Sequence, residues 1–150
     1  MKDCIMFDLD GTLCNLDHRL HHIQGTVKDY DAFYNACSED TLNYPVAALA
    51  RALFDAKYTL WLFSGRTARV LPQTVKWLEE NALGPEMWAY MRFRREGDHT
   101  PDHLLKKSWW EEIPLPYRQN FLFAVEDRKR MVDTWRALGL PCLQVAEGDF

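Results

Sequence analysis

The sequence predicts an α/β fold with a central, mostly parallel sheet covered by helices on both faces. Short continuous apolar runs alternate with helical stretches along its 150 residues, and three of the runs end in polar or acidic groups. Continuous apolar runs are typical of strands buried on both faces, as in a parallel sheet. Strands that alternate with helices form βαβ units, which place helices on both sides of the sheet. The length suits one domain with a single core.

Five apolar segments are the predicted strands. The run at 58–63 is rich in β-branched and aromatic residues and is ended by Ser64 and Gly65. In chain order the predicted strands are 4–7, 58–63, 87–91 (the weakest), 121–125 and 142–145.

Four helical patterns lie between these runs. Pro45 stands where a first-turn proline favours a helix, and Gly84 and Gly139 follow two of the patterns as stop signals. In chain order the predicted helices are 46–56, 70–81, 102–110 and 129–138.

The segment from about 14 to 43 fits neither pattern. It is polar, and we interpret it as a short insertion near the active edge of a single domain spanning 1–150. Its histidines lack further metal ligands nearby, so a solvated helical face is favoured over a metal site. These histidines are His18, His21 and His22.

Three predicted strands end in polar motifs that should meet. Active sites of open α/β sheets lie beyond the carboxyl ends of the strands. If the sheet is parallel, these ends converge on one edge. The motifs are Asp8-Leu9-Asp10-Gly11-Thr12, Ser64-Gly65-Arg66 and Glu126-Asp127-Arg128.

Such convergence would crowd four carboxylates together. Like charges at short range raise pKa values and destabilise the fold unless a cation is present. Oxygen ligands without sulfur or imidazole select a hard cation, which predicts a Mg²⁺ site. The candidate ligands are Asp8, Asp10, Glu126 and Asp127.

Phosphoryl transfer to Asp8 is the chemistry that this arrangement favours. One carboxylate can attack phosphorus and form an aspartyl phosphate. Asp10, on the same face of an extended strand, can protonate the leaving oxygen and later activate water. Gly11 allows a sharp turn, and Thr12 can bind phosphate. Taken alone the motif also fits a strand followed by a turn with surface acids, but the two other strand-end motifs favour the catalytic interpretation.

These residues resemble the haloacid dehalogenase superfamily of phosphatases. The family's DxDGT motif matches residues 8–12, its serine or threonine matches Ser64, and its acidic pair matches Glu126 and Asp127. The resemblance implies a three-layer Rossmannoid sandwich, which in so short a chain has no large cap domain. The family usually has aspartate where this chain has Glu126, which leaves open whether Glu126 contacts the metal directly.

Within this superfamily the chain is similar to the 3′-phosphatase domains of bacteriophage polynucleotide kinase/phosphatases. The similarity covers essentially the whole chain and is weakest in 14–43. It is carried by Ser64-Gly65-Arg66, by Arg95-Glu96-Gly97-Asp98 followed by Asp102 and Lys106, by Glu126-Asp127-Arg128, by Trp135-Arg136 and by the tail at 144–150.

The resemblance implies roles for further residues. Lys106 would offset the charge of Asp8 and phosphate, with Asp102 positioning it, although a surface ion pair is the simpler alternative and Lys107 competes for the role. The Ser64-Gly65-Arg66 segment would bind the phosphoryl group, through the Ser64 hydroxyl and a bidentate Arg66. Arg19, eleven residues after Asp8, aligns with a functional arginine. The alternatives are a turn serine and exposed loop arginines.

The resemblance implies a Mg²⁺-dependent enzyme that removes a terminal phosphate, mainly the 3′-phosphate of a polynucleotide or nucleotide. The 14–43 insertion, Arg66, Arg94 and Arg95 would contact the substrate in an open cleft. The alternatives are a 5′-nucleotidase or small-metabolite phosphatase, and a non-catalytic binding module. Trp109 and Trp110 could stack on a base, although core packing is the commoner role of such tryptophans.

Composition further limits the class of protein to which the chain can belong. The net charge of −4 excludes a chain that is basic throughout. Four scattered cysteines predict reduced thiols in a cytoplasmic protein. We expect no signal peptide, no membrane span and no obligate protein partner. The motif GxxxxGK[ST] is missing, which predicts a stand-alone phosphatase.

Overall fold

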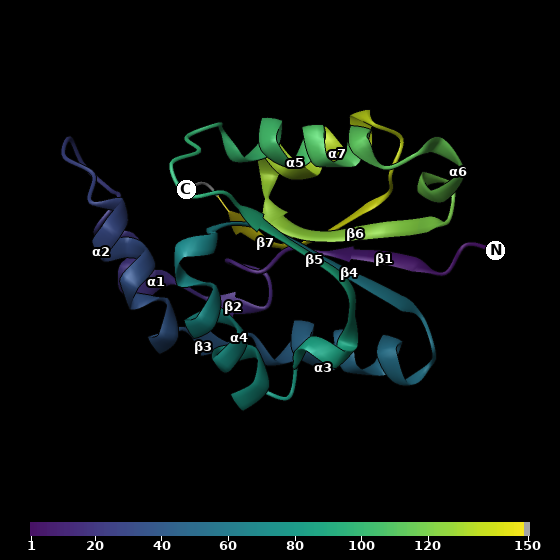
Figure 1. The fold of residues 1–150 in the computed structure, drawn as a ribbon, viewed down its shortest axis with the longest axis horizontal. Coiled ribbons are helices and arrows are strands. Elements are labelled where there is room, and N and C mark those ends of the chain that lie inside the picture. The colour runs from purple at the N-terminus through teal and green to yellow at the C-terminus, as the bar shows by residue number, and fades with distance from the viewer. Residues whose placement is uncertain (149–150) are drawn as a thin grey trace.

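A parallel sheet of five strands, in the order β5-β4-β1-β6-β7, forms the centre of the fold (Figure 1). The computed structural model describes residues 1–148. Later strands are added on both sides of β1, so the sheet has a topological switch point at the carboxyl end of β1. Its strands are β1 (Cys4–Phe7), β4 (Thr59–Thr67), β5 (Trp88–Arg94), β6 (Phe121–Arg128) and β7 (Cys142–Gly148).

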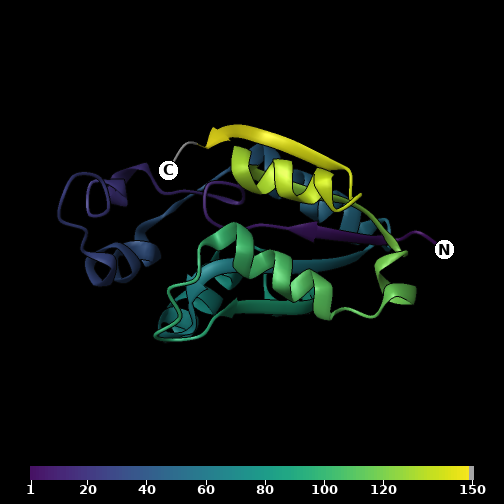
Figure 2. The same cartoon turned by 90° about the horizontal axis from the view of Figure 1, so that it is seen from above.

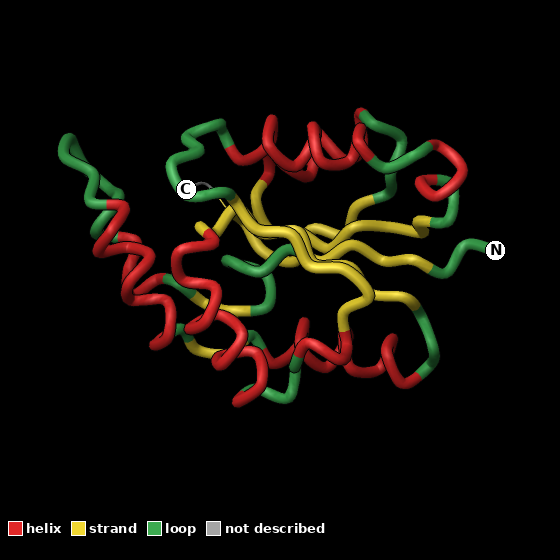
Figure 3. Tube along the Cα trace, viewed as in Figure 1, coloured by secondary structure: helices red, strands yellow, loops and turns green. Residues whose placement is uncertain are grey.

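Helices cover both faces of this sheet, which confirms the predicted sandwich (Figures 1 and 3). α3 and α4 pack on one face, and α5 and α7 pack on the other. The helices are α3 (Tyr44–Asp55), α4 (Leu71–Glu80), α5 (Asp102–Glu112), α6 (Leu115–Arg118) and α7 (Lys129–Ala137), with single 3₁₀ turns η2 (Ala68–Val70) and η3 (Pro85–Met87).

Side chains of the central strand alternate between two cores. Ile5 and Phe7 pack in the cluster under α3 and α4, whereas Met6 packs in the cluster under α5 and α7. This alternation follows from the two-residue period of a strand. Both faces of β1 are therefore buried, and its apolar run has no polar interruption.

The insertion forms a small subdomain at one end of the sheet (Figure 2). Its two short strands pair antiparallel, with Cys14 opposite Leu42. It lies at the end opposite the N-terminus of the chain, next to the carboxyl end of β1. Its elements are β2 (Cys14–Asn15), α1 (Asp17–Leu20), α2 (Tyr30–Asn35), the 3₁₀ turn η1 (Ala36–Glu39) and β3 (Thr41–Leu42).

Four strands, β4, β5, β6 and β7, extend further than predicted, and in two of them the extension includes a polar motif. β4 continues to Thr67 and β6 to Arg128, so the motifs lie inside strands instead of after them. Register shifts in the pairing, between Ser64 and Thr67 and between Glu126 and Arg128, accompany this extension. Such irregularities redirect side chains. β4 and β6 were predicted too short because the prediction ended each strand where its apolar run gives way to polar residues.

The end of α4 also differs from the prediction. Ala82, with φ of 53°, takes the left-handed conformation that the sequence assigned to a glycine stop signal near Gly84. Gly139, with φ of 84°, does end α7 as predicted. The longest helix, α3, has 12 residues, and none in the described part of the chain combines the length and apolarity of a membrane span.

Candidate active site

β1 delivers Asp8 to the carboxyl edge of the sheet. The backbone N–H of Asp8 donates to the Val125 carbonyl at 3.0 Å, which ties it to β6. The chain then turns at Gly11, where φ is +81°. This turn brings the Thr12 hydroxyl 2.9 Å from Asp8 Oδ2 and 3.3 Å from Asp127 Oδ1. One oxygen of Asp8 is thereby fixed by a buried hydroxyl.

Lys106 of α5 holds the other oxygen of Asp8. Its Nζ lies 2.5 Å from Asp8 Oδ1 and 3.0 Å from Glu126 Oε2. Asp102, one turn earlier on α5, is 3.5 Å from the same Nζ. Burial alone would lower the pKa of Lys106, but the three carboxylates hold it well above its usual value. Lys106 is 1% exposed, so its ion pair with Asp102 is not a surface pair. Lys107 instead forms an ion pair with Glu111 on the exposed side of the helix.

Three carboxylates converge beside Lys106. Oxygens of Asp8, Glu126 and Asp127 all lie within 4.8 Å of one another. Burial, reinforced by the charge of Glu126, holds the pKa of Asp8 well above its usual range. Burial raises the pKa of Glu126 to about 7, and burial with the nearby Asp8 raises the pKa of Asp127 to about 6. Burial therefore outweighs the stabilising charge of Lys106 at all three carboxylates.

The three carboxylates fit a divalent metal ion. Three carboxylates against one ammonium leave two negative charges, the charge that one Mg²⁺ neutralises. All the donors are hard oxygens, which this ion prefers. The carboxylate of Asp10, also predicted as a ligand, lies outside this group, because two arginines bind it instead.

Two glycines shape the space around Asp127. A Cβ on Gly11 would lie 2.2 Å from Asp127 Oδ2, and a Cβ on Gly148 would lie 2.5 Å from the same atom. Both positions therefore exclude larger residues while this carboxylate keeps its place. Gly148 ends β7 and belongs to the tail motif noted in the sequence; the last two residues of that motif, Asp149 and Phe150, lie outside the described residues.

Asp10 binds two buried arginines. Arg19 Nη2 lies 2.7 Å and Arg66 Nη2 lies 2.5 Å from Asp10 Oδ1. The same guanidinium atoms lie 2.7 and 3.0 Å from Asp40 Oδ2. Burial would raise the pKa of Asp10, but the two guanidinium groups outweigh it and hold the pKa well below the usual range. Two carboxylates and two guanidinium groups make a neutral buried network.

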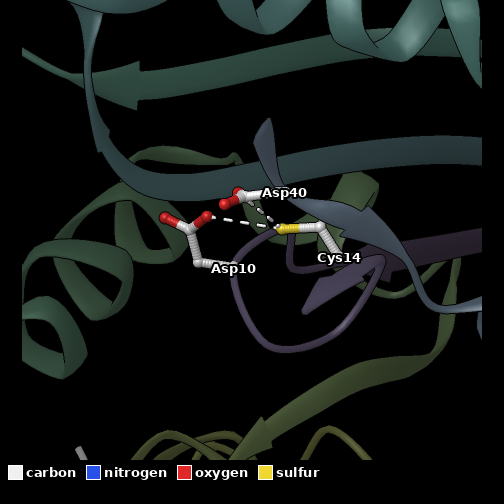
Figure 4. Close-up of side chains that lie close together, drawn as sticks. All are labelled: Asp10, Cys14 and Asp40. Carbon is white, nitrogen blue, oxygen red and sulfur yellow. Dashed lines mark hydrogen bonds between the residues drawn. The ribbon is translucent and has the colours of Figure 1, made fainter. Parts of the chain in front are cut away.

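Cys14 completes this network (Figure 4). Its Sγ lies 3.3 Å from Asp40 Oδ2 and 3.6 Å from Asp10 Oδ1. Burial, with the charge of Asp10, holds the pKa of the Cys14 thiol well above its usual value. These three groups do not form a second metal site, because Arg19 and Arg66 already balance both carboxylates.

β4 brings Ser64, Gly65 and Arg66 to the same edge. Ser64 is buried, and its Oγ accepts a hydrogen bond from the Arg66 backbone N–H at 3.1 Å. The Arg66 guanidinium, 1% exposed, binds Asp10, Asp40 and Thr74. The phosphate-clamping role of Arg66 stays a prediction; the contacts seen here direct it toward Asp10.

The predicted residues fall into three groups. Those in and around the three-carboxylate cluster are Asp8, Thr12, Asp102, Lys106, Glu126 and Asp127. Those around the second carboxylate are Asp10, Arg19 and Arg66. Ser64 and Gly65 lie on β4 between them, and a Cβ on Gly65 would lie 1.9 Å from Asp102 Oδ1.

An open cleft lies in front of these groups. On one rim, Tyr34 of the insertion and Arg94 of β5 both donate to the Gly65 carbonyl, at 3.4 and 2.8 Å. Trp109 and Trp110 lie in the core under α5, so they are not available to a base. Trp77 and Trp135 are buried, and Trp61 is only partly buried.

Sequence reasoning missed two residues of this site. Asp40 binds both arginines and also accepts a hydrogen bond from His18 Nε2 at 2.8 Å. Tyr34 donates a hydrogen bond to the Gly65 carbonyl on β4, next to Ser64. Both belong to the insertion, where no periodic pattern or motif distinguishes one polar residue from another. His18 is exposed, as the predicted solvated face requires, and it also contacts Asp40.

The chain is similar to known proteins in sequence and in fold. The family described as "Polynucleotide kinase PNKP phosphatase domain" matches residues 2–150. Two solved structures are similar: that of a Pnkp1/Rnl/Hen1 complex, with 30% identity and a TM-score of 0.78, and that of the Pnkp1/Rnl/Hen1 RNA repair complex, with 32% identity and a TM-score of 0.81.

The chain spans about half the length of these two proteins. It is covered to 100% and 98%, but it accounts for only 48% and 43% of the matched chains. A haloacid dehalogenase-like family hydrolase from Streptococcus pneumoniae is similar over 95% of this chain and 83% of its own, with 14% identity and a TM-score of 0.64. That likeness supports the fold alone.

Proposed function

Because this chain belongs to the haloacid dehalogenase-like family of polynucleotide kinase phosphatase domains, we propose that it hydrolyses phosphomonoesters through an aspartyl phosphate on Asp8. The preferred substrate is the 3′-phosphate of a polynucleotide or nucleotide. The observation that carries the proposal is the position of Asp8: Thr12 and Lys106 fix its two oxygens, and Asp10 stands two residues away. A nucleophile needs such orientation to attack in line.

The reaction has two steps. In the first, an Asp8 oxygen attacks phosphorus, the bond from phosphorus to the ester oxygen breaks, and Asp10 gives that oxygen a proton. In the second, Asp10 takes a proton from water, which attacks the aspartyl phosphate and releases inorganic phosphate. Lys106, Ser64 and Thr12 bind the phosphoryl oxygens.

The charge state of Asp10 suits the second step. With Arg19 and Arg66 bound, Asp10 is ionised in the ligand-free protein, which is the form that accepts a proton from water. The first step requires the protonated form. The approach of a phosphate dianion favours that form, because a nearby negative charge raises the pKa of a carboxyl group.

Mg²⁺ is the proposed cofactor, and Asp8, Glu126 and Asp127 are its proposed side-chain ligands. When bound, it supplies positive charge that lets a phosphate dianion approach a carboxylate. The raised pKa of Asp8 supports this requirement, because burial disfavours the ionised form of the nucleophile and a bound cation would favour it. Glu126 also contacts Lys106, so its longer side chain serves both groups.

A nucleic-acid end is favoured over a small metabolite by two observations. The cleft is open, and the small insertion is the segment that stands beside it. The two similar structures that carry 30% and 32% identity are of a complex named for RNA repair. A 5′-nucleotidase or small-metabolite phosphatase remains the alternative, since the phosphoryl-transfer residues would be the same.

A substrate panel tests the proposal. The purified protein, with Mg²⁺, is assayed on one oligonucleotide carrying either a 3′- or a 5′-phosphate, and on free nucleoside 3′- and 5′-monophosphates. We expect the 3′-phosphorylated oligonucleotide to have the highest kcat/KM, and Asp8→Asn to abolish turnover. Turnover restricted to 5′-monophosphates would replace the proposal with the nucleotidase. If Asp8→Asn had the same activity as wild type, the covalent mechanism would be refuted.

Partners form a separate part of the proposal. The absence of an obligate protein partner stays a prediction, and the complexes in which similar chains were solved give a reason to test it. Activity of the isolated chain on the oligonucleotide would support it. Activity that appears only after a companion protein is added would contradict it.

A further inference from the structure

Two tyrosines of the insertion form an aromatic surface at the cleft. Tyr30 and Tyr34 stand four residues apart on α2, so their side chains share one face of the helix. Their ring centroids are 6.5 Å apart with an interplanar angle of 29°. Tyr30 is 48% exposed, and both rings line the cleft. We call these two residues the tyrosine pair.

The tyrosine pair is held close to the reacting groups. The Tyr34 hydroxyl donates to the Gly65 carbonyl at 3.4 Å, and Gly65 follows Ser64 on β4. Gly65 also abuts Asp102, which lies 3.5 Å from Lys106 Nζ. One sugar ring separates the 3′-oxygen of a nucleotide from its base. The tyrosine pair and Asp8 line the same cleft, so a nucleotide bound there could contact both.

The helix that carries the pair is fixed to the sheet. Arg69 of η2 donates to Asn35 at 3.0 Å and pairs with Asp31 at 3.1 Å. Phe33 is buried, and the Arg19 guanidinium lies 4.3 Å from the centre of its ring. These contacts hold the tyrosine pair in place before a ligand binds, which lowers the entropic cost of binding.

Positive charge accompanies the aromatic surface. Lys28 lies just before α2, and Arg95 lies just after β5 on the same cleft. Both are exposed, and neither makes an ion pair with another residue in 1–148. Aromatic faces combined with cations that follow the backbone are the means by which proteins bind single-stranded nucleic acid.

The opposite rim lacks aromatic groups. It carries Arg128, Lys129 and Arg130, and Lys129 is paired with Asp133 at 2.7 Å. Among the described residues that line the cleft, every Phe, Tyr or Trp side chain lies on α2. His99 and His103 also line the cleft, so α2 carries the cleft's phenyl and phenol rings while two imidazoles lie outside α2.

From this arrangement we infer a nucleobase subsite: the base of the 3′-terminal nucleotide stacks on Tyr30 and Tyr34, while Lys28 and Arg95 contact the preceding phosphodiesters. The inference rests on the proposed function, because it requires a nucleic-acid substrate whose 3′-phosphate is removed at Asp8. It adds that the substrate strand runs from Asp8 toward α2. A free nucleotide presents the same base without the phosphodiesters, so the tyrosines and the cations make separate contributions.

The test pairs variants with altered substrates. Tyr30→Ala and Tyr34→Phe are compared with wild type on a 3′-phosphorylated oligonucleotide and on the same oligonucleotide with an abasic terminal nucleotide. We expect Tyr30→Ala to lower kcat/KM about tenfold on the first, within the range of one lost stacking contact. It should change little on the abasic substrate. Tyr34→Phe keeps the ring but loses the hydrogen bond to the Gly65 carbonyl, so its loss on the first substrate should be smaller than that of Tyr30→Ala.

Tyr117→Ala is the matched control, because Tyr117 is 63% exposed on α6 and does not line the cleft. An equal loss on both substrates, or an equal loss in the control, would overturn the base contact. The double variant Lys28→Ala with Arg95→Ala should have a lower kcat/KM on the oligonucleotide. Its kcat/KM on a nucleoside 3′-monophosphate should stay unchanged.

A binding measurement separates this inference from the proposed function. Asp8→Asn is titrated with a fluorescent 3′-phosphorylated oligonucleotide, and anisotropy gives Kd with and without Tyr30→Ala. A Kd about tenfold higher for the double variant supports the subsite even if another phosphate proves to be the reactive one. An unchanged Kd, or no binding by Asp8→Asn itself, overturns it.

Discussion

Lys106 Nζ lies 2.5 Å from Asp8 Oδ1, although 98 residues separate the two in the chain. We predict that Lys106→Met lowers kcat/KM by at least about 100-fold, because the phosphoryl group loses a buried cation. The variant leaves Asp8 and Glu126 without their shared partner, a change that costs about 3–5 kcal/mol for a buried pair. Steady-state kinetics and thermal unfolding measure both effects. Lys107→Met, altered at an exposed neighbour, should keep wild-type activity; similar losses in both would refute the assignment.

Stabilisation by Mg²⁺ should increase with pH. The pKa of Glu126 is raised to about 7 and that of Asp127 to about 6, so the folded, metal-free protein binds protons more tightly than the unfolded chain. Their contribution to stability is present below about pH 4 and is lost as pH rises through 6 and 7. Metal binding requires the deprotonated forms. We therefore expect a small rise in Tm on adding Mg²⁺ at pH 5 and a large rise at pH 8, measured by thermal melts.

Asp127→Asn is the control for this pH dependence. It removes one ligand charge, so the rise in Tm at pH 8 should shrink. A rise that is equal at pH 5 and pH 8 in wild type would argue against carboxylate ligation.

Asp40 should be needed to position the arginines. It accepts from Arg19 and from Arg66, and both arginines also bind Asp10. Asp40→Asn keeps the shape but removes the charge that balances the second arginine. We expect kcat to fall at least about tenfold with a smaller change in KM, and unfolding to become easier by about 2–4 kcal/mol, as for a buried network that loses one partner. Glu39→Gln, at an exposed neighbour, should match wild type. Unchanged kcat in Asp40→Asn would separate this network from catalysis.

Gly148→Ala should weaken metal binding. The added methyl group would lie 2.5 Å from Asp127 Oδ2 and 3.0 Å from the Arg128 Cα, so either the carboxylate or the backbone must shift. Displacing a group that orients a ligand costs about 10- to 100-fold in metal affinity. Isothermal titration with Mg²⁺, or activity against Mg²⁺ concentration, measures it. Glu147→Ala, one residue earlier, should bind metal normally. Equal affinities of Gly148→Ala and wild type would show that the tail does not support the site.

The sheet and its motifs were predictable because local pattern determines them. An apolar run followed by Asp8 is visible in the sequence, and alternation with helices implies parallel strands whose ends converge. Lys106 was found by its spacing within a resemblance, since an i,i+4 pair with Asp102 is otherwise ordinary. The strands were predicted too short because the polar ends of β4 and β6 remain paired with their neighbours.

The insertion was not predictable in the same way. Asp40, Tyr34 and His18 act through contacts with residues distant in sequence, and their own neighbourhood contains no period or motif. The difference between Asp10 and the metal-binding carboxylates has the same origin. Arg19 and Arg66 bind Asp10 and keep it apart from the other carboxylates, and they come from segments that the sequence alone does not place together.

The ends of the insertion are joined through the network that holds Asp10. Arg19 near its start and Asp40 near its finish are 2.7 Å apart, and the intervening chain passes through Gly25, around which no other side chain or backbone crowds. That tip can therefore lengthen, shorten or change its residues without moving Asp10. Under the proposed function, the substrate contacts on α2 and the chemistry at Asp8 and Asp10 are then free to evolve separately.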